Sequence, residues 1–165
     1  MRGASKKEGE KPMNHYQRYK MNPKEVEVYL KLAEYLGELL IIPRVSKVLN
    51  TIPLNNPVTK LIVTDTCGVN TAGQTWYYSE EESIIELSSW ILYDIEEARK
   101  VIRHEFAHVV QCYCKYEGSM HGRGFNKALK VVSARRWKTD KHWDATPRID
   151  KVRKKYHPKI RVLLG

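Results

Sequence analysis

One segment near the middle of the chain constrains the fold more than any other. Asp94-Ile95-Glu96-Glu97 has the spacing of a helix start, in which the side chain of an N-cap residue accepts a hydrogen bond from a free backbone amide. The apolar positions that follow recur every three or four residues, at Ile95, Ala98, Val101, Ile102, Phe106, Val109 and Tyr113. Such a broad apolar stripe is typical of a helix that is buried along one side. We therefore predict a helix over about residues 95–115.

This helix carries the sequence His104-Glu105-Phe106-Ala107-His108. Two histidines four residues apart lie on one helical face, about 5–6 Å apart at Cβ, so both imidazoles can reach one metal ion. Glu105 then lies beside the ion, where a carboxylate can take a proton from metal-bound water. The other interpretation is an ordinary helix with two polar histidines, since the pattern also arises by chance. The capped amphipathic helix favours the metal site, with Glu105 as the catalytic residue.

A third ligand must come from outside this pair. The metzincin pattern needs a histidine at position 114, where this chain has Cys114. The only glutamate after His108 is Glu117, in the segment that follows the helix. Cys112 lies four residues after His108, but a cysteine there is more often a small buried residue than a ligand. None of these residues completes a known ligand set as well as a later histidine does.

His121 is that histidine. Gly122 follows it, and the apolar positions Phe125, Leu129 and Val132 then predict a further helix that can pack back on the first and hold the imidazole. The remaining histidines lack such a frame, and they are His15, His142 and His157.

The segments before the metal-binding helix predict an α+β domain. Asn22-Pro23-Lys24-Glu25 marks a helix start, and one apolar face continues until Pro43, so we predict a helix over about 23–41. Three short apolar or aromatic segments bounded by turn residues follow, at 60–66, 74–79 and 83–89. We predict that they form a small three-stranded antiparallel sheet. Residues 84–88 are the expected edge, to which a substrate peptide adds as a further strand.

The order of these features resembles a known protease family. A helix, three strands ending in Ile-x-Leu-Ser at residues 85–88, His-Glu-x-x-His, and a loop leading to His-Gly-x-x-Phe are similar to the SprT-like zinc metalloprotease domain, which Spartan also contains. The resemblance covers about residues 24–135 and implies a zincin-like fold. It implies one Zn²⁺ per chain held by His104, His108 and His121, with Glu105 as the catalytic base. It also implies a zinc metalloendopeptidase that cleaves DNA-bound or DNA-crosslinked proteins.

The positive charge is concentrated toward the C-terminus. The net charge is +10, yet residues 123–165 carry 14 basic and 3 acidic side chains, whereas residues 1–122 carry 15 and 16. Basic residues interleaved with aromatic ones suit a nucleic acid, although a solvated basic face has the same composition. No cysteine follows Cys114, so we do not expect the zinc ribbon of bacterial-type members. We therefore expect the basic C-terminal residues to contact DNA, either single-stranded or double-stranded. The candidate nucleic-acid-binding residues are Arg135, Arg136, Lys138, Lys141, Trp143, Lys151, Arg153, Lys154 and Lys155.

We divide the chain into a flexible polar arm (1–20), the SprT-like domain (21–136) and a basic C-terminal segment (137–165). No apolar run approaches the ~20 residues that a bilayer span needs, and residues 1–12 lack the apolar core of a signal peptide. Three cysteines, Cys67, Cys112 and Cys114, cannot all pair with one another and suit free thiols. We expect a cytoplasmic protein, or a nucleoid or nuclear one, with no membrane partner.

Two other functions fit the same residues. A non-enzymatic nucleic-acid-binding protein would use the three histidines for a structural zinc and leave Glu105 without a role. A general zinc peptidase not linked to DNA would use the basic tail for solubility or for another acidic partner. Cleavage of a DNA-binding protein, measured with and without DNA, separates these functions.

Overall fold

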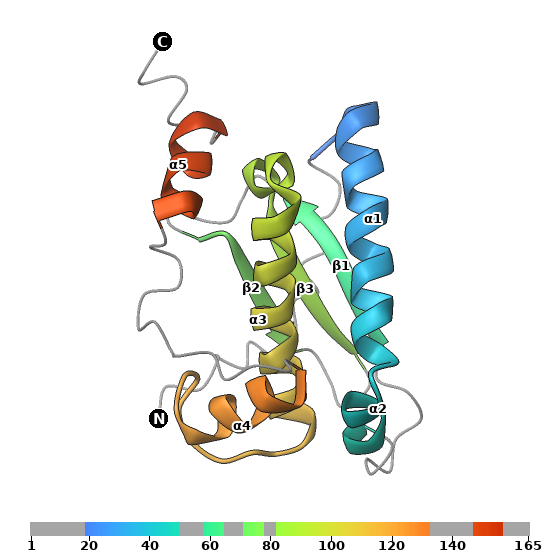
Figure 1. The fold of residues 1–165 in the computed structure, drawn as a ribbon, viewed down its shortest axis with the longest axis vertical. Helices are drawn as coiled ribbons and strands as arrows, with labels where there is room; N and C mark the ends of the chain where they lie inside the picture. Colours follow the sequence, from blue (N-terminus) through green and yellow to red (C-terminus); the bar gives the residue numbers. More distant parts are fainter. Residues whose placement is uncertain (1–18, 50–57, 65–70, 78–81, 133–146, 157–165) are drawn as a thin grey trace, which may run out of the picture.

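Five helices, one 3-10 helix and three strands make up the part of the chain that the structure describes. The computed structural model describes residues 19–49, 58–64, 71–77, 82–132 and 147–156, and Figure 1 shows their arrangement. In chain order the elements are α1 (Pro23–Leu40), α2 (Pro43–Leu49), β1 (Val58–Thr64), β2 (Gly73–Tyr77), β3 (Glu82–Ser88), η1 (Ser89–Tyr93), α3 (Ile95–Tyr113), α4 (Arg123–Val132) and α5 (Pro147–Tyr156).

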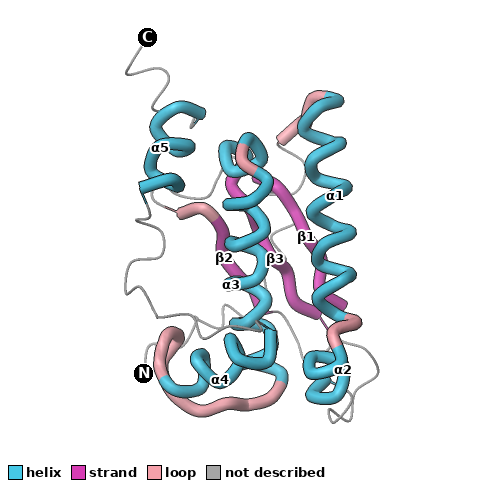
Figure 2. The backbone as a smooth tube through the Cα atoms, in the orientation of Figure 1, coloured by secondary structure: helices cyan, strands magenta, loops and turns pink. Residues whose placement is uncertain are grey.

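The sheet is mixed, so the prediction of a wholly antiparallel sheet is wrong. The strand order is β1-β3-β2, with β3 parallel to β1 and antiparallel to β2. Residues 83–88 of β3 are all buried, which suits a strand with a neighbour on each edge. Hydrophobic pattern identifies strands but not their neighbours, and that is why the order was missed. Residues 84–88 are therefore central, and the predicted substrate edge is also wrong; among the strands in Figure 2, β1 and β2 form the edges.

Helix α3 lies against the sheet, with α1 at its side and α4 packed on it (Figure 1). Its predicted start is confirmed, because the Asp94 side chain accepts a hydrogen bond of 3.2 Å from the Glu97 amide. The predicted apolar stripe is buried, apart from Ile95, which is half-buried. Burial continues around the helix to Ala107 and Val110, so α3 is enclosed on several sides over its second half.

The other predicted helices are also present. Asn22 caps α1 as expected, since its side chain accepts from the Glu25 amide and Glu25 accepts from the Asn22 amide in return. Phe125, Leu129 and Val132 of α4 are buried, as their spacing predicts. Helix α2 was not predicted, because Pro43 was taken only as a stop. A proline is also common in the first turn of a new helix.

Helix α5 lies in the segment that sequence analysis treated only as a basic tail. Ile149 is 1% exposed and Val152 is 8% exposed, and both belong to the same buried cluster as the core of α3. The Tyr156 ring stacks on the Tyr93 ring of η1 at 4.3 Å between centroids. The Arg148 guanidinium donates hydrogen bonds of 2.9 and 3.0 Å to the two carboxylate oxygens of Asp94. Helix α5 is thus joined to the start of α3 by apolar burial and by an ion pair.

The remaining expectations concern membranes and cysteines. None of the helices in the ranges given above combines the length and the apolar character that crossing a bilayer requires. Cys112 and Cys114 are free thiols, as predicted, and Cys67 lies outside the described residues.

Replacing Ile149 by alanine tests whether α5 belongs to the core. We expect Ile149→Ala to reduce the free energy of unfolding by roughly 2–4 kcal/mol, because a large buried side chain is removed and a cavity remains. Urea denaturation measures this change. The control is Lys154→Ala on the exposed side of the same helix, which should change stability by less than about 0.5 kcal/mol. Equal, small effects of the two substitutions would show that α5 does not contribute to the core.

Candidate metal centre

Three histidines come together where the sequence predicts a metal site. His104 and His108 extend from the middle of α3, and His121 extends from the turn just before α4. One ring nitrogen from each histidine lies within 4.8 Å of the corresponding nitrogens of the other two. The Nε2 atoms of His104 and His121 are 3.1 Å apart. Two nitrogen ligands of a tetrahedral zinc lie about 3.3 Å apart, given Zn–N distances of about 2.0–2.1 Å, so the spacing suits such an ion.

Phe125 supports all three imidazoles. Its ring, 2% exposed, stacks on His108 at 4.3 Å between centroids and lies 4.9 Å from both His104 and His121. The apolar ring therefore forms one wall of the site and restricts the rotation of each histidine. This contact explains why a phenylalanine follows His121 by four residues, in the first turn of α4.

The connection between α3 and α4 is held in a tight path, which places His121. The Gln111 side-chain amide donates a hydrogen bond of 3.2 Å to the Ser119 carbonyl, joining α3 to this connection. A Cβ atom on Gly124 would lie 2.4 Å from the Glu117 carbonyl oxygen, so the chain can fold back this closely only beside a glycine.

The protein environment keeps two of the histidines neutral. The pKa of His104 is lowered to about 2, mainly by burial and also by the neighbouring His108 and His121. The pKa of His108 is lowered to about 4, first by burial and then by His121, while a hydrogen bond with Gln111 acts in the opposite direction. Neutral imidazole is the form that offers a lone pair to a metal.

Glu105 lies on a different side of α3 from the histidines, toward the sheet. It is 7% exposed. The Thr75 hydroxyl of strand β2 lies 2.7 Å from its Oε2 atom and 3.0 Å from its backbone oxygen. The His-Glu-x-x-His motif predicts Glu105 beside the metal but gives no indication of Thr75, because no motif links a strand residue to a helix 30 residues later. The one available signal was weak: Gly73 and Thr75 are two residues apart, so they share one face of a strand that must pack on the helix.

The other candidate ligands do not join the cluster. Glu117 and Cys112 are exposed, and the metal-competent group in the described part of the chain consists of the three histidines alone. His15, His142 and His157 fall on residues outside the described ranges.

Four of the nine candidate nucleic-acid-binding residues can be placed. Lys151, Lys154 and Lys155 are exposed on α5, whereas Arg153 is half-buried, with its guanidinium 5.7 Å from the centre of the Trp90 ring. Arg135, Arg136, Lys138, Lys141 and Trp143 lie in residues 133–146, outside the described part. The exposed lysines form a basic surface on one helix, and Arg153 also packs against the core.

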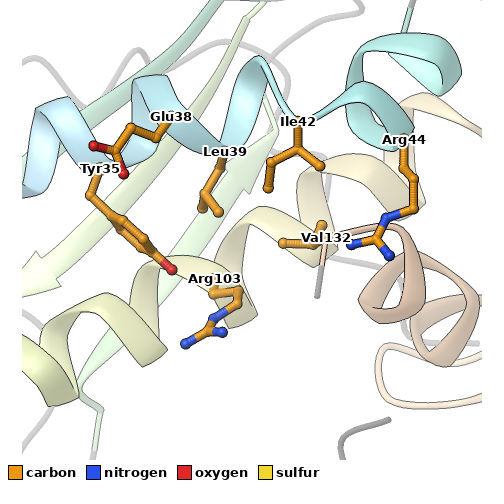
Figure 3. Close-up of a pocket in the computed structure, with 7 residues that line it drawn as sticks. All are labelled: Tyr35, Glu38, Leu39, Ile42, Arg44, Arg103 and Val132. Atoms are coloured by element: carbon orange, nitrogen blue, oxygen red, sulfur yellow. The ribbon is translucent and has the colours of Figure 1, made fainter. Parts of the chain in front are cut away.

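A hollow of about 300 Å³ between α1, α2, α3 and α4 does not include the histidine cluster (Figure 3). Arg44 and Arg103 line it together with Glu38, and the other lining side chains are Tyr35, Leu39, Ile42 and Val132. Side chains of both charges line the hollow, so it selects no single class of ligand. The histidine cluster is therefore the better candidate for chemistry.

A comparison with protein families identifies the chain. The model of the SprT-like family matches residues 55–144, which is more than half of the chain and includes every histidine of the cluster. The chain belongs to the SprT-like family. Searches of curated proteins and of solved structures gave no match. The cluster in this SprT-like chain thus lies within the segment by which the family is recognised.

Metal binding tests the assignment of His121. We expect the SprT-like chain to bind a divalent transition metal, and His121→Ala to weaken that binding at least 100-fold, because a three-ligand site would lose one ligand. Titration with Co²⁺, followed by its visible absorption, measures the affinity. The control is Glu117→Ala in the same connection, which should bind as the parent does. Unchanged affinity in His121→Ala would exclude this residue from the site.

Proposed function

We propose that this SprT-like protein is a zinc-dependent endopeptidase. SprT-like proteins are generally metalloproteases. The observation that carries the proposal is the position of a buried carboxylate, Glu105, on the helix that also presents two of the three clustered histidines. A structural metal site needs the three ligands but not this carboxylate.

The three histidines would hold one Zn²⁺ per chain. They supply only nitrogen donors, and His104 and His108 are neutral, which suits zinc among the common divalent ions. Three protein ligands leave a position for water, as is usual in catalytic zinc sites. When bound, zinc lowers the pKa of a water molecule toward 7 and polarises a carbonyl group.

Glu105 would move the proton. In a zincin-like arrangement the Glu105 carboxylate accepts a proton from the attacking water and later returns it to the leaving amine. Its burial favours this role, since a carboxylate in a site with little water interacts strongly with nearby charge. A purely structural zinc site would leave this carboxylate only its hydrogen bond with Thr75, and we therefore favour the enzyme over the non-enzymatic alternative.

The substrate would bind beside β2. This strand lies at an edge of the sheet, contacts α3, and reaches Glu105 through Thr75. A peptide that adds to a sheet edge is held mainly by backbone hydrogen bonds, which give affinity with little sequence preference. We therefore propose extended, locally unfolded protein segments as substrates.

The basic surface of α5 supports a link to DNA. Lys151, Lys154 and Lys155 are exposed on one short helix, and positive side chains grouped in this way bind phosphates. We propose that the substrates are proteins bound or crosslinked to DNA, which would bring enzyme and substrate to the same polyanion. If this surface does not bind DNA, the alternative is a zinc peptidase that is not linked to DNA.

Glu105→Gln separates catalysis from metal binding. We expect this variant to keep the fold and the zinc but to lose at least about 100-fold in kcat/KM, because the proton acceptor is removed while its size is preserved. Cleavage of an unfolded protein, with zinc content measured in parallel, provides the test. Glu117→Gln, an exposed change of the same chemistry, should retain parental activity. A Glu105→Gln enzyme as fast as the parent would refute the proposed chemistry.

The DNA link is tested at α5. Each phosphate contact contributes about −0.7 to −0.9 to the slope of log affinity against log salt, so Lys151, Lys154 and Lys155 changed together to alanine should flatten it by about 2–3 units. Arg153 is kept because it packs on Trp90. Fluorescence anisotropy with labelled DNA over a range of salt concentrations measures the slope.

The matched control removes the same charge elsewhere. Lys20, Lys24 and Lys47 are exposed at or near α1 and α2, and changing them together to alanine should leave the slope close to that of the parent. If the two triple variants behave alike, the basic surface of α5 is not a DNA-binding surface.

A further inference from the structure

The contact between Thr75 and Glu105 joins the edge strand to the proposed catalytic base. The Thr75 Oγ1 atom lies 2.7 Å from Glu105 Oε2 and 3.0 Å from the Glu105 backbone oxygen. A hydroxyl donates one hydrogen at a time, and a charged carboxylate is the stronger acceptor of the two. The contact is therefore a hydrogen bond from a strand residue to the carboxylate, with the backbone oxygen as a second position for the same hydrogen.

The packing of β2 on α3 fixes this contact. A Cβ atom on Gly73 would lie 2.5 Å from Cγ1 of Val101, so the strand approaches the helix as closely as a glycine allows. Thr75 follows Gly73 by two residues, about 6.6 Å along a strand, and Glu105 follows Val101 by four, about 6 Å along a helix. The two elements therefore run in register, and close packing at the first pair brings the second pair into hydrogen-bond distance.

We propose that Thr75 is a positioning residue for the Glu105 carboxylate, an inference that rests on the proposed endopeptidase function. A glutamate side chain has several rotatable bonds, so without a fixed partner its carboxylate samples several positions. The Thr75 hydroxyl restricts this motion, and it does so from a strand that is itself held in the sheet opposite Ile85.

Substrate binding would act on the same contact. The strand that holds Glu105 through a side chain is the one proposed to pair with the substrate through its backbone. A peptide paired along β2 would therefore lie on the same strand as the residue that holds the carboxylate. Loss of the hydroxyl should affect the chemical step more than substrate binding, because the edge of the strand remains.

The first experiment needs no enzymatic activity. In the full chain with metal removed by a chelator, Thr75→Val, Glu105→Leu and the double variant are compared by urea denaturation. We expect Thr75→Val to reduce the folding equilibrium constant at least about tenfold when Glu105 is present and much less when leucine replaces it, because only the first case breaks a hydrogen bond to a charged group. Equal effects in both backgrounds would overturn the proposed contact.

A matched control uses another threonine of the same sheet. Thr64 of β1 donates a hydrogen bond of 2.5 Å to Glu86, and Glu86 follows Ile85 on β3, so it points to the other face of the sheet. Thr64→Val makes the same chemical change without touching Glu105. Its effect on stability should be the same with Glu105 and with leucine at that position. This comparison separates the specific contact from a general loss of a strand hydroxyl.

The second experiment measures zinc-loaded enzyme. Thr75→Val should lower kcat about tenfold, keep KM within about twofold and retain the parental zinc content, and Thr75→Ser should restore most of kcat because it restores the hydroxyl. A loss in KM alone, or no rescue by serine, would show that Thr75 only supports the strand. If the parent itself cleaves nothing, the proposed function fails, and the stability experiment still decides whether Thr75 holds Glu105.

Discussion

The close packing of α3 on the sheet is the constraint on which the site depends. At Gly73 the strand leaves no room for a side chain beside Val101, so the helix cannot rotate or shift without opening the core. Successive residues of a helix point about 100° apart, and a helix held in this way directs His104 and Glu105 to different neighbours. His104 meets α4 and Glu105 meets β2. The proposed ligands and the proposed base thus receive separate supports from α4 and from β2.

The two supports differ in their chemistry. Phe125 places an apolar ring against the imidazoles, and burial favours the neutral, ligating form of His104 and His108. Thr75 instead offers a hydrogen to a carboxylate that has to remain charged to accept a proton. A buried charge without such a partner is costly, whereas a neutral imidazole tolerates an apolar wall. The imidazoles on one face of α3 thus have an apolar neighbour, and the Glu105 carboxylate on another face has a hydrogen-bond donor, as their proposed roles require.

Local signals predicted the histidine cluster and most of the helices, because caps, helical spacing and a four-residue histidine pair are properties of short segments. The Asn22 and Asp94 caps and the buried face of α4 are examples. The strand order could not be predicted in this way. Whether β3 lies at an edge or in the centre depends on which strands pair with it, and the hydrophobic pattern of its own residues is the same in both cases. Helix α5 was missed for a similar reason, since its few apolar residues, Ile149 and Val152, are diluted by lysines and become significant only through contact with η1.

The position of α5 relates the basic surface to the histidines. Arg148 binds Asp94, the N-cap of α3, and His104 lies ten residues further along that helix, about 15 Å at 1.5 Å per residue. In the proposed function, a polyanion held on Lys151 and its neighbours would therefore lie on the helix that is joined to the start of α3. The Asp94 carboxylate in this ion pair stays charged down to acidic pH: burial alone raises the pKa of Asp94, but Arg148 and the Glu97 amide lower it overall. The proposed polyanion surface on α5 and the histidines on α3 are thus connected through the contacts at the start of α3.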